Sequence, residues 1–147
     1  MRLMPERPHS VSLVIDTSAL LATLWAEPTR DAVLVSLAEA DTLLLSSCCA
    51  LEASIVTAAR LGPAGEAELA HLLAVFGVEI VSFTPAQAAL ATDAWRRFGK
   101  GRHPAGLNII DCCSYALAAS ASLPLLAVGD DFPRTDLQIV PLDLGSA

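Results

Sequence analysis

The sequence predicts an α/β fold in which a mostly parallel central sheet lies between two layers of helices. Short apolar segments alternate with longer segments of helical periodicity, and this alternation is typical of parallel strands joined by helices. The first short segment, at residues 11–15, is apolar and rich in β-branched residues, as expected for a strand covered on both faces. A length of 147 residues suits one domain, which we assign to residues 11–147. Residues 1–10 are polar and contain proline, so we expect a flexible tail there.

The first half of the chain contains two predicted strands and three predicted helices. Thr29 is a plausible N-cap for the second helix, because its hydroxyl can accept a hydrogen bond from a free backbone N–H. Gly62 and Pro63 are expected to end the third helix. The elements expected are, in order, strand 11–15, helix 18–25, helix 29–40, strand 42–45 and helix 47–60.

The second half continues the same alternation. Thr84 is predicted to cap a helix that has Pro85 in its first turn, and Asn108 is predicted to cap the last helix. Residues 137–142 can add an edge strand, which Pro141 limits because proline has no N–H to donate. The elements expected are, in order, helix 64–76, strand 79–83, helix 85–98, loop 99–107, helix 109–120 and strand 123–128.

The charge of the chain is acidic overall, with a local basic cluster. A net charge of −7 is unfavourable for binding nucleic acid, yet four of the nine Lys and Arg residues fall within residues 96–102. Such a cluster is usually a solvated face, but this one directly precedes another candidate site residue. The residues expected to hold a polyanion are Arg96, Arg97, Lys100, Arg102 and Arg134.

The composition narrows the class of protein further. Apolar residues make up 54% of the chain, which predicts exposed apolar surface and favours a dimer or a partner protein. No run of 18 apolar residues occurs, so we expect no membrane span and a cytoplasmic protein. The four cysteines form two adjacent pairs without zinc-site spacing, which indicates buried, reduced thiols.

Acidic residues recur where the predicted strands end. Asp16 directly follows the first strand, and Asp130 and Asp131 follow the last one. Glu52 and Asp111 lie in helices that begin near strand ends. Each acid has a simpler interpretation, as a helix cap, a surface residue or a partner of the helix dipole. All of them can nevertheless converge on one edge of a parallel sheet, where ligands usually bind.

Four carboxylates in one pocket need a cation. Each close pair repels by about 4 kcal/mol at a surface-like dielectric, and hard oxygen ligands select Mg²⁺, or alternatively Mn²⁺. A cation at such a site lowers the pKa of a bound water, which can then attack a phosphodiester. Thr17 and Ser18 are placed to orient a carboxylate or such a water.

Four segments of the chain carry a family resemblance. They are VIDTSALLA at residues 14–22, LEASIV at 51–56, GKGRHPAGLN..DC at 99–112 and LLAVGDDFPRTD at 125–136. In this order they resemble the PIN-domain ribonucleases, and specifically the VapC toxins of prokaryotic toxin–antitoxin pairs. The resemblance implies a PIN-like three-layer α/β/α sandwich with a mostly parallel central sheet, and a single PIN domain at residues 11–147.

The resemblance also implies roles for particular residues. Family members often have Asn at the position of Asp130, which favours Asp131 as the acid in that pair. Ser18 corresponds to the family's supporting hydroxyl. The chain departs from the family at Ile110, where a small residue is usual, and this side chain either faces the core or narrows the substrate groove. The implied Mg²⁺ cluster is Asp16, Glu52, Asp111 and Asp131, with Asp130 assisting.

The implied activity is that of an endoribonuclease toxin which cleaves structured RNA such as tRNA or rRNA. The implied partners are a VapB-type antitoxin that blocks or distorts the acidic site, and a second copy in a homodimer. Two alternatives remain at this point. One is a catalytically silent PIN domain that binds only RNA or a partner, and the other is a receiver-like domain that accepts a phosphoryl group. The second lacks paired acids after the first strand, because Asp16 stands alone there.

Overall fold

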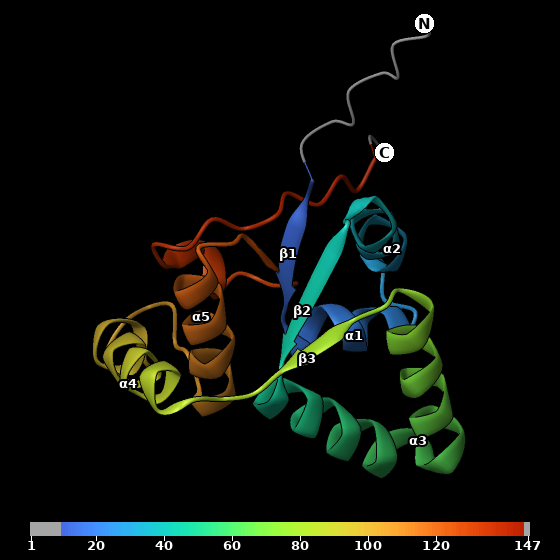
Figure 1. Cartoon of the computed structure of the whole chain (residues 1–147), viewed down its shortest axis with the longest axis horizontal. Coiled ribbons are helices and arrows are strands. Elements are labelled where there is room, and N and C mark those ends of the chain that lie inside the picture. Colours follow the sequence, from blue (N-terminus) through green and yellow to red (C-terminus); the bar gives the residue numbers. More distant parts are fainter. Residues whose placement is uncertain (1–9, 146–147) are drawn as a thin grey trace, which may run out of the picture.

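The computed structural model describes residues 10–145, and within them a four-stranded parallel sheet forms the centre of the molecule (Figure 1). The strands lie in the order β3-β2-β1-β4, so β1 pairs with both β2 and β4. The predicted tail falls almost entirely on residues 1–9, outside the described part, and stays a prediction. The strands are β1 (Ser12–Ile15), β2 (Thr42–Ser46), β3 (Glu79–Val81) and β4 (Leu125–Leu126).

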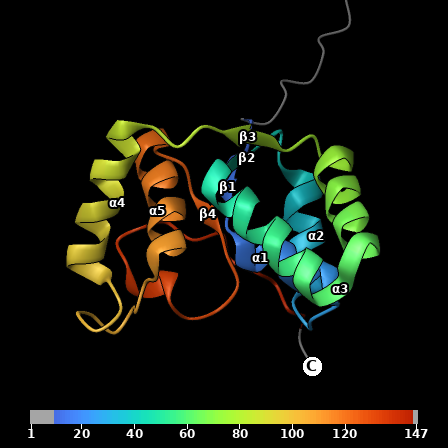
Figure 2. The ribbon, with the colours of Figure 1, turned by 90° about the horizontal axis from the view of Figure 1, so that it is seen from below.

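Helices cover both faces of the sheet. Figures 1 and 2 show α1, α2 and α3 on one side, with α4 and α5 side by side on the other. Because side chains alternate along a strand, Leu13 and Ile15 of β1 pack toward α1–α3, whereas Val14 packs toward α4 and α5. Two cores on two faces confirm the predicted α/β/α sandwich. The helices are α1 (Thr17–Leu24), α2 (Arg30–Glu39), α3 (Ser47–Val75), α4 (Pro85–Phe98) and α5 (Ile109–Ala121).

Helix α3 turns a sharp corner in its middle (Figure 1). Gly62 has φ 66° and ψ −160°, a backbone conformation that favours glycine, and Pro63 follows it. The predicted break is therefore confirmed, although the next predicted helix, at residues 64–76, follows the corner without a loop. At 29 residues α3 is the longest helix of the described chain, yet no described helix is long and apolar enough to cross a bilayer.

Two predicted caps are confirmed and one is wrong. The Thr84 side chain accepts a hydrogen bond from the Gln87 N–H, and the Asn108 side chain accepts one from the Asp111 N–H. Thr29 precedes α2 as predicted, but its buried hydroxyl has no partner among the described residues. The reason is its helical backbone, with φ −80° and ψ −6°, because an N-cap needs an extended conformation to point its side chain at the helix.

The predicted edge strand at residues 137–142 is reduced to a single bridge, and the last strand is shorter than predicted. Only Ile139 forms a bridge to Leu125, and β4 itself is limited to two residues. Pro124 and Pro141 flank this pairing, and neither has an N–H to extend it. The chain after β4 is therefore mostly irregular, which leaves the segment with Asp130 and Asp131 as a loop.

Candidate active site

The predicted acids surround the sheet edge at which β1, β2 and β4 end. Asp16 directly follows β1, and α3, which carries Glu52, begins directly after β2. The loop with Asp131 follows β4, and Asp111 lies in the first turn of α5. Because these strands are parallel neighbours, their ends lie at one edge, where ligands of parallel sheets bind.

Both oxygens of the Asp16 carboxylate are held by hydrogen bonds. It is only 3% exposed, and its Oδ2 accepts a hydrogen bond from the Ser18 N–H at 3.0 Å, which makes it the N-cap of α1. Its Oδ1 accepts a hydrogen bond from the Ser114 hydroxyl at 2.5 Å. Asp16 can therefore be both a helix cap and a site residue, since its Oδ2 caps α1 and its Oδ1 faces α5.

Ser114 is a site residue that the sequence analysis missed. It is fully buried, and its Oγ also lies 3.0 Å from the Cys49 sulfur of α3. It follows Asp111 by one helical turn and therefore lies on the same face of α5. A buried hydroxyl in an apolar helix, one turn after a candidate acid, is the signal that could have identified it.

Asp111 forms a reciprocal cap with Asn108. Its Oδ2 accepts a hydrogen bond from the Asn108 N–H at 3.0 Å, while its own N–H donates to the Asn108 side chain at 2.9 Å. This capping box holds the carboxylate at the start of α5. The simpler interpretation, that Asp111 stabilises the start of a helix, is therefore correct, and a second role in a site is compatible with it.

The pKa of Asp111 responds to burial and to the charges of the other predicted acids. Burial raises its pKa most, the Asn108 N–H opposes that change, and the charges of Asp16, Asp131 and Glu52 raise it further, to about 6. A carboxylate with this pKa lies among like charges that its surroundings do not neutralise. The structure therefore brings four predicted acids into one electrostatic neighbourhood.

The structure distinguishes Asp131 from Asp130. Both are exposed in the loop after β4, but Asp131 is the one whose charge acts on Asp111. Asp130 instead lines a shallow cleft with Val140 and Pro141. Their placement agrees with the preference for Asp131 and leaves Asp130 at the margin of the site.

The two hydroxyls after Asp16 differ in placement. The Ser18 Oγ accepts a hydrogen bond from the Val128 N–H at 3.0 Å and so ties the loop after β4 to α1. Thr17 is buried, and its hydroxyl donates to the Cys49 carbonyl oxygen at 3.4 Å. Thr17 therefore links α1 to α3 within the protein, which argues against the predicted role of orienting a water.

Ile110 packs against the apolar core between the sheet and helices α1–α3. The first of the two alternatives for this side chain, that it faces the core, thus accounts for its position. It also lines part of an apolar groove of about 610 Å³ together with Trp95 and Lys100.

The predicted basic residues differ in the contacts that they make within the protein. The Arg97 guanidinium pairs with Asp136 at 2.8 Å and with Asp93 at 3.6 Å, so two carboxylates of the protein already contact it, and its role as an RNA ligand stays a prediction. Arg102 stacks over the Trp95 ring at 4.7 Å, and Arg134 donates to the Pro104 carbonyl oxygen. Arg96 and Lys100 are exposed and complete the basic surface around the loop at residues 99–107.

The four carboxylates fit a hard divalent cation by their chemistry, because all of them offer oxygen donors and nothing else. Across residues 10–145, however, no three His, Cys, Asp or Glu side chains are close enough to hold one ion together. Mg²⁺ usually keeps several waters and takes one or two protein carboxylates directly, so this wider spacing is compatible with it.

Comparisons with known proteins agree with this architecture. Residues 13–137 match the family model described as PIN domain. Ribonuclease VapC30 of Mycobacterium tuberculosis is 44% identical over 131 residues, which cover 88% of this chain and 99% of that protein.

Two solved structures share the fold. The crystal structure of Mycobacterium tuberculosis VapC20, a Sarcin-Ricin loop cleaving toxin, superposes with a TM-score of 0.72 at 17% identity and covers 88% of this chain and 98% of that one. VapBC2 from Rickettsia felis, bound to a DNA fragment from its promoter, gives a TM-score of 0.69 at 14% identity and covers 88% and 96%. At these identities the superpositions establish a common fold.

Proposed function

The chain belongs to the PIN-domain family, within which it groups with the VapC ribonucleases, and from this premise we propose that it is a Mg²⁺-dependent endoribonuclease toxin. One observation carries the proposal. The Ser114–Asp16 hydrogen bond fastens α5 to the end of β1, so that Asp16 and Asp111 face the same region from two elements. Mn²⁺ is the natural substitute for Mg²⁺ at an all-oxygen site.

We assign the cation to Asp16, Glu52, Asp111 and Asp131, with part of the coordination through water. A bound Mg²⁺ would supply Lewis acidity and an ionised water as nucleophile near neutral pH. The orientation of the Asp16 carboxylate is fixed, because Ser18 donates to its Oδ2 and Ser114 of α5 donates to its Oδ1. Asp111 keeps one oxygen outside its cap, since Asn108 engages only Oδ2.

We propose structured RNA, such as tRNA or rRNA, as the substrate. Lys100 and Arg102 lie in the loop that leads into α5, and Arg134 contacts Pro104 of the same loop. These cations can neutralise the backbone phosphates that an acidic protein would otherwise repel. The exposed Trp95 ring beneath Arg102 adds an aromatic surface beside them. Such a reaction belongs in the cytoplasm, where these RNAs are found.

We further propose two protein partners. A VapB-type antitoxin would neutralise the enzyme, since VapBC2 is a structural neighbour. A second copy of the chain would cover the exposed apolar residues of α3 and α5. Leu51 and Ile55 lie one turn apart on α3 and are 60% and 59% exposed, and Ile109 at the start of α5 is 79% exposed. Sedimentation of the purified chain measures this association.

The proposed activity is tested by incubating the protein with total tRNA and rRNA, in Mg²⁺ and in EDTA. We expect wild-type protein to cleave in Mg²⁺ only. Asp131→Asn should reduce the rate by about 100-fold or more, because it removes a carboxylate from the cation site. Asp31→Asn is the matched control, since Asp31 is an exposed first-turn acid of α2 with the same charge.

Each other outcome of this experiment has a clear meaning. Cleavage in EDTA at the rate seen in Mg²⁺ would exclude a cation mechanism. RNA binding without cleavage by the wild-type protein would identify a silent PIN domain instead. Wild-type rates for Asp131→Asn would remove Asp131 from the site.

A further inference from the structure

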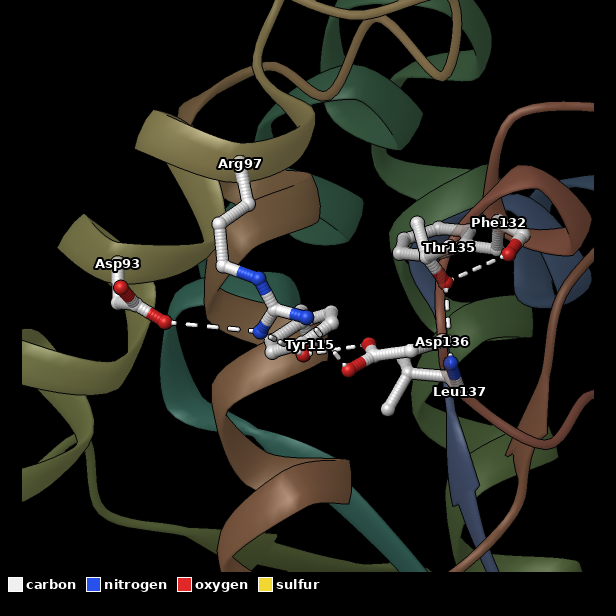
Figure 3. Close-up of polar contacts among 7 residues, drawn as sticks. All are labelled: Asp93, Arg97, Tyr115, Phe132, Thr135, Asp136 and Leu137. Atoms are coloured by element: carbon white, nitrogen blue, oxygen red, sulfur yellow. Dashed lines mark hydrogen bonds and ion pairs between the residues drawn. The ribbon is translucent and has the colours of Figure 1, made fainter.

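A polar network joins three separate parts of the chain beside the proposed site (Figure 3). The Tyr115 hydroxyl of α5 donates to Asp136 Oδ1 at 2.6 Å, and Arg97 of α4 donates to Asp136 Oδ2 at 2.8 Å. Arg97 also donates to the Tyr115 oxygen at 3.2 Å and pairs with Asp93 one turn earlier in α4 at 3.6 Å. Asp136 is thus held by two helices at once.

Asp136 ends a short loop whose other end is also fastened. The loop begins at Val128, whose N–H donates to the Ser18 hydroxyl just after Asp16. Its last residue, Asp136, is bound by Tyr115. The segment that carries Asp131 is therefore tied at one end to the element with Asp16, and at the other end to helix α5.

The interior of this loop is compact. The Phe132 side chain is only 4% exposed and packs into the core between the sheet and helices α4 and α5. The Thr135 hydroxyl donates to the Phe132 carbonyl oxygen at 2.6 Å and accepts a hydrogen bond from the Leu137 N–H at 3.3 Å (Figure 3). Within the same turn the Arg134 N–H donates to the Asp131 carbonyl oxygen at 3.2 Å, and the Thr135 N–H donates to the Phe132 carbonyl oxygen at 2.9 Å. The backbone of Asp131 is therefore hydrogen-bonded into the turn that leads to Asp136.

Tyr115 lies one helical turn beyond Asp111, on the same face of α5. We infer that Tyr115, Asp136 and Arg97 are positioning residues that fix the separation between Asp131 and Asp111, and thereby the affinity of the site for a divalent cation. The inference rests on the proposed function, because it concerns the same cation site. None of the three residues contacts the cation or the RNA in this assignment.

The protonation states of the network keep it intact at neutral pH. Burial alone would raise the pKa of Asp136, but the hydrogen bonds from Tyr115 and Arg97 outweigh it, and the pKa lies below its ordinary value. Burial and the neighbouring Asp136 raise the pKa of Tyr115 to about 12. The carboxylate is therefore charged and the phenol protonated wherever the enzyme would work.

The test is a titration of the full chain with Mn²⁺ alone, followed by calorimetry. Tyr115→Phe removes one hydroxyl and keeps the ring that packs in the core. We expect it to bind Mn²⁺ about tenfold more weakly, the effect typical of residues that orient metal ligands. Its RNA cleavage should fall at limiting Mg²⁺ and recover in excess Mg²⁺, with an unchanged KM for RNA. Asp136→Asn should show the same pattern.

Asp93→Asn is the matched control. It removes the other ion pair of Arg97, within α4, and does not loosen the loop, so its Mn²⁺ affinity should equal that of wild type. Melting in EDTA reports on the fold of each variant. If Tyr115→Phe and Asp136→Asn lower the Tm but bind Mn²⁺ as wild type does, the network is structural only and the inference is overturned. A wild-type chain that binds no Mn²⁺ overturns the proposed function and this inference together.

Discussion

Asp111 lies in the first turn of α5, and Asp136 is bound by Tyr115 of the same helix. Burial pushes the pKa of each upward, yet one pKa lies above and the other below the ordinary value of Asp. Asp111 has three carboxylates among its neighbours, and its pKa rises to about 6. Asp136, close to the next turn of the helix, has Arg97 and Tyr115 as partners, and its pKa falls. Asp111 is the more buried of the two, and burial is the largest cause of its raised pKa. The partners then act in opposite directions, because the neighbouring carboxylates add to the effect of burial at Asp111, whereas Tyr115 and Arg97 outweigh it at Asp136.

The two carboxylates differ in whether the protein itself supplies partners for their charge. The network around Asp136 is complete within the protein, because every charge in it has an opposite charge or a donor in contact. The region around Asp111 concentrates negative charge, and under the proposed function a cation from solution would neutralise it. Self-sufficient pairing marks a structural region, and unbalanced charge beside it marks a site.

The largest effect on stability is expected from Ser114→Ala. The change removes the hydroxyl that donates to the buried Asp16 carboxylate and leaves that oxygen without its donor. We expect a loss of about 2 kcal/mol in the free energy of unfolding in EDTA, because an unsatisfied buried charge is costly. Denaturant unfolding measures it, and Ser120→Ala, an exposed serine of the same helix, is the control. An equal loss in both variants would mean that the bond to Asp16 has no special weight.

A pH series in EDTA separates the two carboxylates. The folded-state pKa of Asp111 is raised to about 6 from 3.8, so its contribution to stability is full below about pH 4 and is lost as the pH rises through 6. After allowance for solvent screening we expect a fall of about 1–2 kcal/mol over this range. Asp111→Asn should abolish it. A wild-type profile that is flat between pH 4 and 7 would contradict the crowding of acids around Asp111.

Asp136 should show the opposite sign in the same series. Its folded-state pKa is lowered, so its contribution is present above the ordinary pKa of Asp and is lost as the pH falls below that value. The effect should be small, because the side chain is half exposed. Asp136→Asn should remove it, while the fall that Asp111 causes stays.

The smallest effect concerns two arginines of the basic segment. Arg102 has no carboxylate in contact among its described neighbours, whereas Arg97 has two. We expect Arg102→Ala to weaken metal-free RNA binding and to reduce the salt slope of log K by about 1. Compared with Arg102→Ala, Arg97→Ala should change the salt slope less and lower the Tm more. Filter binding at several salt concentrations measures the slopes. Equal slopes for the two variants would mean that Arg97 also binds RNA.

The fold was largely predictable from the sequence because periodicity and caps follow local rules. The corner at Gly62 and the caps at Thr84 and Asn108 are examples in which one or two residues determine the backbone. Thr29 does not act as a side-chain cap because its own backbone is helical, which its residue type does not reveal. The edge strand is reduced to one bridge because Pro124 and Pro141 flank the pairing of Leu125 with Ile139 and have no N–H to extend it.

The site was predictable in part. Asp16 and Asp111 could be placed, since strand ends and helix starts determine their positions. The contacts that Ser114 and Arg97 make could not, because each joins residues that are distant in sequence, Ser114 to Asp16 and Arg97 to Asp136. Such pairs form because the folded elements pack side by side, and a local sequence pattern does not predict this packing.

Asp16 is both the cap of α1 and an acceptor for α5, whereas Asp111 caps only its own helix. The two positions therefore differ in what survives their loss. Under the proposed function, a change at Asp16 would therefore cost stability as well as activity. A change that neutralises Asp111 would cost less stability, and the resulting inactive but folded copy would still compete for a VapB-type antitoxin as a decoy.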